Sequence, residues 1–136
     1  MPDENRKTLS KLRLEQAREC LESAQLEMAS GYYRGAANRN YYCCFHTMRA
    51  VLAIDGFDSK RHQGIIAAFR QKYIKTGIFP ANFSNTIKDA FENRGKSDYD
   101  DFFIISKEAT AEQIENTKNF LEAVEEFITT LQSTAK

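Results

Sequence analysis

The sequence predicts an all-α protein, an antiparallel up-and-down bundle of about five helices. Apolar residues recur every three or four positions along most of the chain, which is the period of one helix face. Glycines separate these periodic stretches at intervals of about twenty residues, and glycine near a helix C-terminus supplies the left-handed residue that ends the helix. A length of 136 residues suits a single domain, 1–136, with a helical core over about 7–133.

The first helix is expected over about 7–30 and the second over about 33–54, with Gly31 between them. In the second helix Cys44 and Val51 widen the apolar stripe, so this helix is expected to be the most buried. The two apolar rows are, in order, Leu14, Ala17, Leu21, Ala24 and Met28, and then Ala37, Tyr41, Phe45, Met48 and Leu52.

The third helix is expected over about 60–76, after Gly56. Asp58 or Ser59 can cap its first N–H groups, because short polar side chains accept hydrogen bonds from the first turn of a helix. Its apolar row is Ile66, Phe69 and Tyr73.

The fourth helix is expected after Pro80 and Asn82 and ends near Gly95, and the fifth begins at a capping box, Thr110-x-x-Gln113. Spacings of three and four alternate in the fifth helix, which suits near-antiparallel bundle packing. Residues 97–107 follow no helical period and are expected to form an ordered loop whose four consecutive apolar residues pack on the bundle. The apolar rows are Phe83, Ile87 and Phe91, and then Ile114, Leu121, Val124, Ile128 and Leu131.

The composition excludes several classes of protein. With 42% apolar and 28% charged residues, the chain suits neither a disordered segment nor a membrane protein. It has no apolar run of about 18 residues and no secretory signal, so we expect a cytoplasmic protein with no membrane contact. Cys20, Cys43 and Cys44 show no C-x-x-C spacing, and neighbours on a helix do not face each other, so we expect reduced packing residues. No metal and no cofactor are expected.

Net charge is zero, but its distribution is uneven. Residues 34–96 contain eleven Lys and Arg against four Asp and Glu, whereas residues 97–136 contain three against nine. A basic middle segment suits a phosphate-bearing partner, and ordinary solvated helix surfaces are the alternative interpretation.

Arg94 continues the apolar row of the fourth helix by one further step. A buried guanidinium cannot lose its charge and needs a partner, and Asp98 and Tyr99 lie just beyond it. Gly95 would let the backbone turn so that one of them folds back. One interpretation is an Arg94–Asp98 clamp that closes the helix end. The other is an arginine poised for a phosphate, with Asp98 and Tyr99 orienting it.

A second group of polar residues lies on the second helix. Arg39 and His46 are seven positions apart, hence nearly on one face, with Asn38 and Tyr42 adjoining them. Cations beside stackable rings suit a nucleic-acid backbone or a nucleotide, although such residues on a buried helix can also be core.

A third group, Lys60 and His62, stands at the expected start of the third helix. The macrodipole there favours anions, and capping or solubility is the alternative role. The sequence contains no P-loop, no G-x-G-x-x-G and no H-E-x-x-H, so an ATPase, a Rossmann site and a zinc protease have no support.

The segments that hold these groups resemble the HEPN superfamily, in particular its short stand-alone members. The matching segments are Ala37-Asn38-Arg39-Asn40-Tyr41-Tyr42 with Phe45-His46, Lys60-x-His62-x-Gly64 with Phe69, and Arg94-x-x-Ser97-Asp98-Tyr99. The resemblance spans about residues 10–130 and implies a helical bundle that is usually a homodimer, with its site near the subunit junction.

The resemblance also implies a range of functions. Many HEPN proteins are metal-independent ribonucleases and toxins that pair with a minimal nucleotidyltransferase antitoxin, and other relatives bind nucleotides. Their motif is an arginine followed, after four to six residues, by a histidine. Arg94 corresponds to the arginine, but Tyr99, Asp100 and Asp101 stand where the histidine belongs. A histidine matters because imidazole exchanges protons near neutral pH.

We therefore expect a component of a toxin–antitoxin or nucleotidyltransferase-associated system that engages RNA or nucleotide through Arg94, Asp98 and Tyr99. The alternative is a catalytically inert module that binds a nucleotide or docks a nucleotidyltransferase.

Overall fold

The structure, a computed structural model, describes residues 4–134, and within that range every regular element is a helix. The prediction of an all-α bundle is confirmed. The elements are α1 (Glu4–Ala29), α2 (Tyr33–Ile54), α3 (His62–Phe69), the π-helical turn η1 (Arg70–Ile74), α4 (Asn82–Tyr99) and α5 (Lys107–Thr134).

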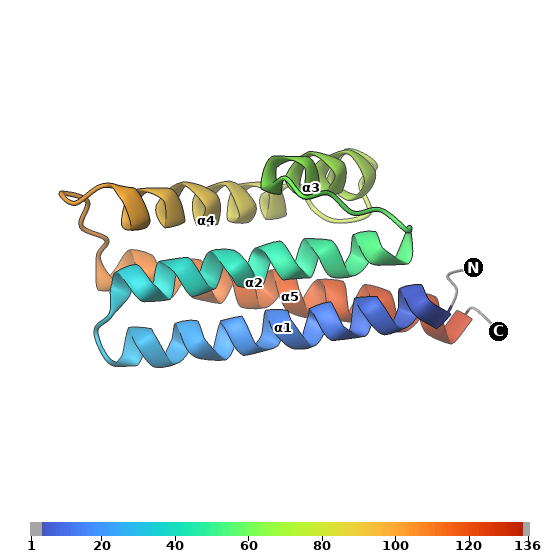
Figure 1. The fold of residues 1–136 in the computed structure, drawn as a ribbon, viewed down its shortest axis with the longest axis horizontal. Helices are drawn as coiled ribbons and strands as arrows, with labels where there is room; N and C mark the ends of the chain where they lie inside the picture. The colour runs from blue at the N-terminus through green and yellow to red at the C-terminus, as the bar shows by residue number, and fades with distance from the viewer. Residues whose placement is uncertain (1–3, 135–136) are drawn as a thin grey trace.

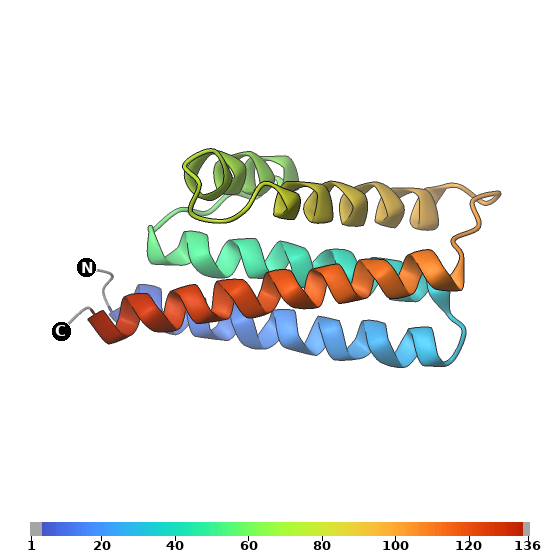
Figure 2. The same cartoon turned by 180° about the vertical axis from the view of Figure 1, so that it is seen from behind.

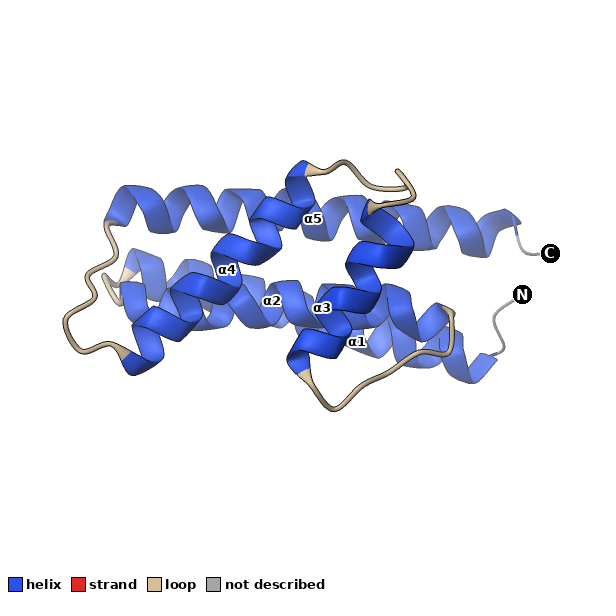
Figure 3. Cartoon of the chain, turned by 90° about the horizontal axis from the view of Figure 1, so that it is seen from above, coloured by secondary structure: helices blue, strands red, loops and turns tan. Residues whose placement is uncertain are grey.

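The four long helices alternate in direction along the chain, and α2 lies in the middle of the bundle (Figure 1). Seen from behind, α5 lies in front of α1 and α2, and the start of α1 and the end of α5 lie at one end of the bundle (Figure 2). The short α3 departs from the simple up-and-down order, because it lies beside α4 across the face of α2 (Figure 3).

Burial explains the central place of α2. Its buried residues occur on most sides of the helix and join two apolar clusters, one shared with α3, α4 and α5 and the other with α1 and α5. Alanines at 36, 37, 50 and 53 are 2% exposed or less, and such small side chains allow neighbouring helices to approach closely. The expectation that the second helix is the most buried is met.

Glycine ends some of the helices as expected, but not α4. Gly31, Gly56 and Gly77 have positive φ angles and follow α1, α2 and η1. Gly95 does not have a positive φ, and α4 continues through it to Tyr99. The expected turn at Gly95 is therefore wrong, and the loop expected over 97–107 shortens to 100–106.

The expected helix starts also need correction. Ser59 Oγ accepts a hydrogen bond from the Arg61 N–H at 3.2 Å, and Asp58 Oδ1 accepts one from the Ser59 N–H. Both N–H groups precede the first residue of α3, so neither side chain caps this helix. The fifth helix begins at Lys107 instead of Thr110, because Ser106 Oγ accepts a hydrogen bond from the Ala109 N–H at 3.0 Å.

The segment 102–105 does not pack as expected. Phe102 and Ile104 are 94% and 90% exposed, and Ile105 is the member of this run that is buried. The backbone is held instead by Arg34 of α2, which donates hydrogen bonds to the carbonyl oxygens of Ser97 at 2.6 Å, Asp100, Asp101 and Phe103. This arginine caps the end of α4 and fixes the following loop.

The three cysteines are buried and free, as expected. Burial raises the pKa of Cys44 to about 12, so its thiol stays protonated. Among the described residues, no helix combines the length and the apolar character that crossing a membrane requires.

Candidate functional site

Arg94 projects from the last two turns of α4 toward α2. Its Nε lies 3.1 Å from Asp98 Oδ2, one helical turn onward, without the alignment of a hydrogen bond, so the contact is an ion pair. Its side chain is 20% exposed. The expected Arg94–Asp98 clamp therefore forms, on a continuous helix and without a turn at Gly95.

Aromatic rings surround the Arg94 guanidinium. The guanidinium carbon lies 5.4 Å from the ring centroid of Tyr41, 5.6 Å from that of Tyr42 and 5.9 Å from that of Tyr99. Tyr42 also accepts a hydrogen bond from an Arg94 amino group at 3.3 Å. Cation–π contacts with three rings hold the guanidinium in place.

Asp98 connects this arginine to α2. Asn38 donates a hydrogen bond to Asp98 Oδ2 at 3.2 Å, and Arg39 donates to Asn38 Oδ1 at 2.7 and 3.1 Å. The guanidinium carbon of Arg39 lies 5.2 Å from the ring centroid of Tyr42. A polar chain thus runs from Arg39 through Asn38 and Asp98 to Arg94, with Tyr42 contacting both arginines.

His62 reaches the same place from the start of α3. Its Nδ1 lies 2.7 Å from the hydroxyl of Tyr41, and its ring stacks on Phe45 with centroids 4.1 Å apart. Burial raises the pKa of Tyr41, so the phenol stays protonated, and the tautomer of His62 decides which of the two groups is the donor. In the tautomer in which the phenol donates to Nδ1, the hydrogen of the neutral ring lies on Nε2.

Burial and the charges of Arg94 and Arg49 lower the pKa of His62, so the ring is neutral at neutral pH. His46 stands one turn after Tyr42, with ring centroids 6.2 Å apart. Burial and the neighbouring arginines, Arg49 first among them, lower the pKa of His46 to about 4. Both histidines are therefore uncharged among several cations.

Most of the residues expected at a site meet here, although they come from three helices. Arg94, Asp98 and Tyr99 of α4, Asn38, Arg39 and Tyr42 of α2, and His62 of α3 make up what we call the Arg94 cluster. His46 lies at its edge. Lys60 is exposed and makes no hydrogen bond or ion pair with any residue that the structure describes.

Arg13 of α1 is a residue that the sequence interpretation missed. It is 6% exposed and donates hydrogen bonds to the Arg49 carbonyl and to Asp58, each at 3.1 Å, and Asp58 also contacts the Arg49 guanidinium. The sequence spacing indicates that Arg13 is buried, because it precedes Ala17 by four positions and so lies on the buried row of α1. This triad ties α1 to α2 and to the loop before α3.

The same part of the chain offers no metal site. Among the described residues, no group of three or more His, Cys, Asp and Glu side chains has the arrangement to hold a metal ion. The Arg94 cluster combines two cations, the Asp98 carboxylate, a neutral imidazole and aromatic rings, and its cations and rings suit a phosphate group beside a base.

Comparison with known proteins gives the family. The model of the HEPN domain matches residues 10–127. The chain is 32% identical over 116 residues to a UPF0332 protein of Thermotoga maritima, covering 85% of this chain and 88% of that protein. It is 28% identical over 123 residues to a Methanocaldococcus jannaschii protein named "Putative toxin MJ0142", covering 90% of this chain and 83% of that protein. A second protein of that organism, "Putative toxin MJ0605", is 30% identical over 63% of this chain and 64% of its own length. The helical fold and the order of the motifs agree with the family match, and this chain belongs to the HEPN domain family.

Proposed function

We propose that the protein binds RNA or nucleotide phosphates at the Arg94 cluster, as a component of a toxin–antitoxin or nucleotidyltransferase-associated system. The name "Putative toxin" that two relatives carry supports this setting. The usual dimeric state of the family supports a homodimer, with a minimal nucleotidyltransferase as a further partner.

The observation that carries the proposal is the incomplete hydrogen bonding of Arg94. The Arg94 side chain is 20% exposed and its Nε is ion-paired with Asp98, yet Tyr42 is the one hydrogen-bond acceptor that the described residues provide for its amino groups. Leaving such donors without acceptors costs free energy. Phosphate oxygens would satisfy them with charge-assisted, bidentate geometry.

His62 strengthens this assignment. With Nδ1 accepting from Tyr41, the free Nε2–H is a neutral donor beside a fixed cation, which is suited to a phosphate oxygen. Arg39, held by Asn38 and stacked on Tyr42, adds a second cation on the α2 side.

A ribonuclease is the second candidate function. The motif histidine is absent after Arg94, but His62 occupies the neighbourhood of Arg94 from a different helix, and both contact the rings of Tyr41 and Tyr42. In that case the pair would act on RNA as the arginine and histidine of the family motif do.

The experiment is a titration of a labelled single-stranded RNA and of ATP into the wild type, Arg94→Gln and Lys11→Gln. Lys11 is an exposed cation on α1 and serves as the matched control for loss of charge. We expect at least about tenfold weaker binding for Arg94→Gln, because charge-assisted hydrogen bonds contribute about 1.5–3 kcal/mol.

RNA cleavage is followed in the same samples and in a fourth protein, His62→Phe. Cleavage that disappears in Arg94→Gln and in His62→Phe would favour the ribonuclease. Binding without cleavage would favour the inert module. Equal affinity of all three proteins for both ligands would refute the proposed site.

A further inference from the structure

We propose that the groove between α3 and α4 is a second nucleotide subsite, which holds the phosphate and base of the RNA unit next to the one at the Arg94 cluster. This inference rests on the proposed function and extends it, because it makes the preferred ligand a single-stranded RNA of at least two nucleotides.

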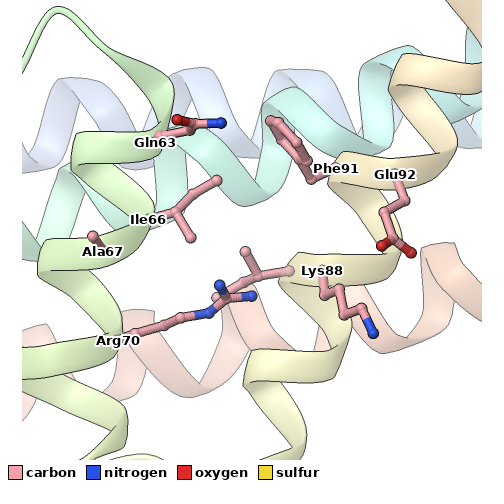
Figure 4. Close-up of a pocket in the computed structure, with 8 residues that line it drawn as sticks. Gln63, Ile66, Ala67, Arg70, Lys88, Phe91 and Glu92 are labelled. Carbon is pink, nitrogen blue, oxygen red and sulfur yellow. The ribbon is translucent and has the colours of Figure 1, made fainter.

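The groove has a volume of about 350 Å³ and combines an apolar middle with charged side chains on both walls (Figure 4). Ile66 and Ala67 of α3 face Ile87 and Phe91 of α4, so the middle of the groove is apolar. Arg70 extends from the α3 side toward α4, and Lys88 stands on the opposite wall (Figure 4). Two cations thus flank an apolar floor, with Glu92 as the one carboxylate of the lining.

Arg70 has the same incomplete hydrogen bonding as Arg94. It donates to the Ser84 carbonyl at 3.3 Å, but its Nε is buried and has no hydrogen-bond partner in the described part of the chain. It stands where α3 changes into the π-helical turn η1, a local distortion that is frequent at functional sites. A phosphate oxygen in the groove would accept from the part of the guanidinium that lines it.

The groove adjoins the Arg94 cluster along the seam of α3 and α4. Gln63 at its upper end follows His62 directly, and the Phe91 ring meets the Tyr41 ring with centroids 5.7 Å apart. On α4, Lys88 and Arg94 are six residues and so about 9 Å apart along the helix axis. A dinucleotide can bridge that distance.

The lining suits a base and its ribose. Phe91 and the aliphatic side chains beside it provide the apolar surface on which a base can lie, and single-stranded nucleic acids are held by such surfaces next to cations. Gln63 can pair with a base edge, and the Glu92 carboxylate can accept from a ribose hydroxyl, which RNA has at the 2′ position. Lys88 and Arg70 then flank the phosphate.

The test compares a mononucleotide, AMP, with an eight-nucleotide single-stranded RNA. Both are titrated into the wild type, Arg70→Gln, Lys88→Gln and the control Lys75→Gln, whose side chain is exposed and lies outside the groove lining. We expect Arg70→Gln and Lys88→Gln to bind the RNA about five- to tenfold more weakly and to bind AMP as the wild type does. The slope of log K against log salt for the RNA falls by about 0.7 for each variant.

Lys88 is exposed on α4, so its substitution leaves the fold intact and keeps the test valid if Arg70→Gln is destabilised. Unchanged RNA affinity and salt slope in Lys88→Gln would overturn the subsite while the Arg94 site stands. A wild type that binds neither AMP nor RNA would overturn the proposed function and, with it, this subsite.

Discussion

Arg94 is a charged residue on the apolar row of α4, and only some of its partners follow from the sequence. A cation on the apolar row of a helix needs a partner, and the i,i+4 carboxylate at Asp98 is the partner found. The Tyr41 and Tyr42 rings and His62 could not be assigned to it in advance, because they come from other helices and meet it only through the way α2, α3 and α4 cross. Local partners follow from sequence spacing, whereas partners across helices require the packing.

His46 makes the stability of the protein depend on pH. Its pKa falls from 6.5 in the unfolded chain to about 4 in the fold, because the ring is part-buried and close to arginines. The folded protein therefore binds fewer protons than the unfolded chain between these values. The contribution of neutral His46 to the unfolding free energy is fully present above pH 6.5. It is lost as the pH falls from 6.5 to about 4.

We expect the unfolding free energy to drop by about 2 kcal/mol more in the wild type than in His46→Gln between pH 7 and pH 4, once solvent screening is allowed for. Urea unfolding of both proteins at the two pH values measures it. Parallel losses in the two proteins would show that His46 does not carry this dependence.

At the scale of the element, the periodic rows located the helices well, and α2 in particular matches its expected range of 33–54. The errors fall at helix ends. Gly95 suggested a turn, but the Arg94–Asp98 ion pair and the capping of the last α4 carbonyls by Arg34 carry the helix past it. Arg34 stands in α2, far from α4 in sequence, so no local pattern could indicate this cap.

Gly95→Ala tests the extended α4. A Cβ at this position would meet nothing within 4 Å, and the backbone is helical. Alanine should therefore raise the unfolding free energy by about 0.5–1 kcal/mol, through its higher helix propensity and a less flexible unfolded chain. A loss of stability in chemical denaturation would instead indicate the left-handed turn.

Arg34→Gln tests the cap. Without the guanidinium, the Ser97, Asp100 and Phe103 carbonyls lose their shared donor. We expect the amides of Asp100 and Phe103 to exchange with solvent about tenfold faster, while the core amides of α2 keep their protection. The charge control is Lys11→Gln, which should leave the loop unchanged. Equal protection in Arg34→Gln would mean that the loop is held by other contacts.

For the whole molecule, the helical class and the alternating order of the long helices could be predicted because apolar residues recur at the helical period and must face other helices in a bundle. The contact between α3 and α4 could not be predicted from the sequence. The expected third helix, 60–76, is in fact α3 followed by the π-helical turn η1, and its placement beside α4 creates both the Arg94 cluster and the groove with Arg70.

The most direct test of the account is to map where RNA binds on the folded protein. Amide signals of the isotopically labelled protein are followed by NMR during titration with an eight-nucleotide single-stranded RNA. We predict that the shifts concentrate at residues 38–42, at His62 and at 94–99, and that Arg94→Gln strongly reduces them at the same RNA concentrations. Shifts confined to α1 and α5, or no shifts in the wild type, would contradict the claim that Arg94 organises an RNA-binding site.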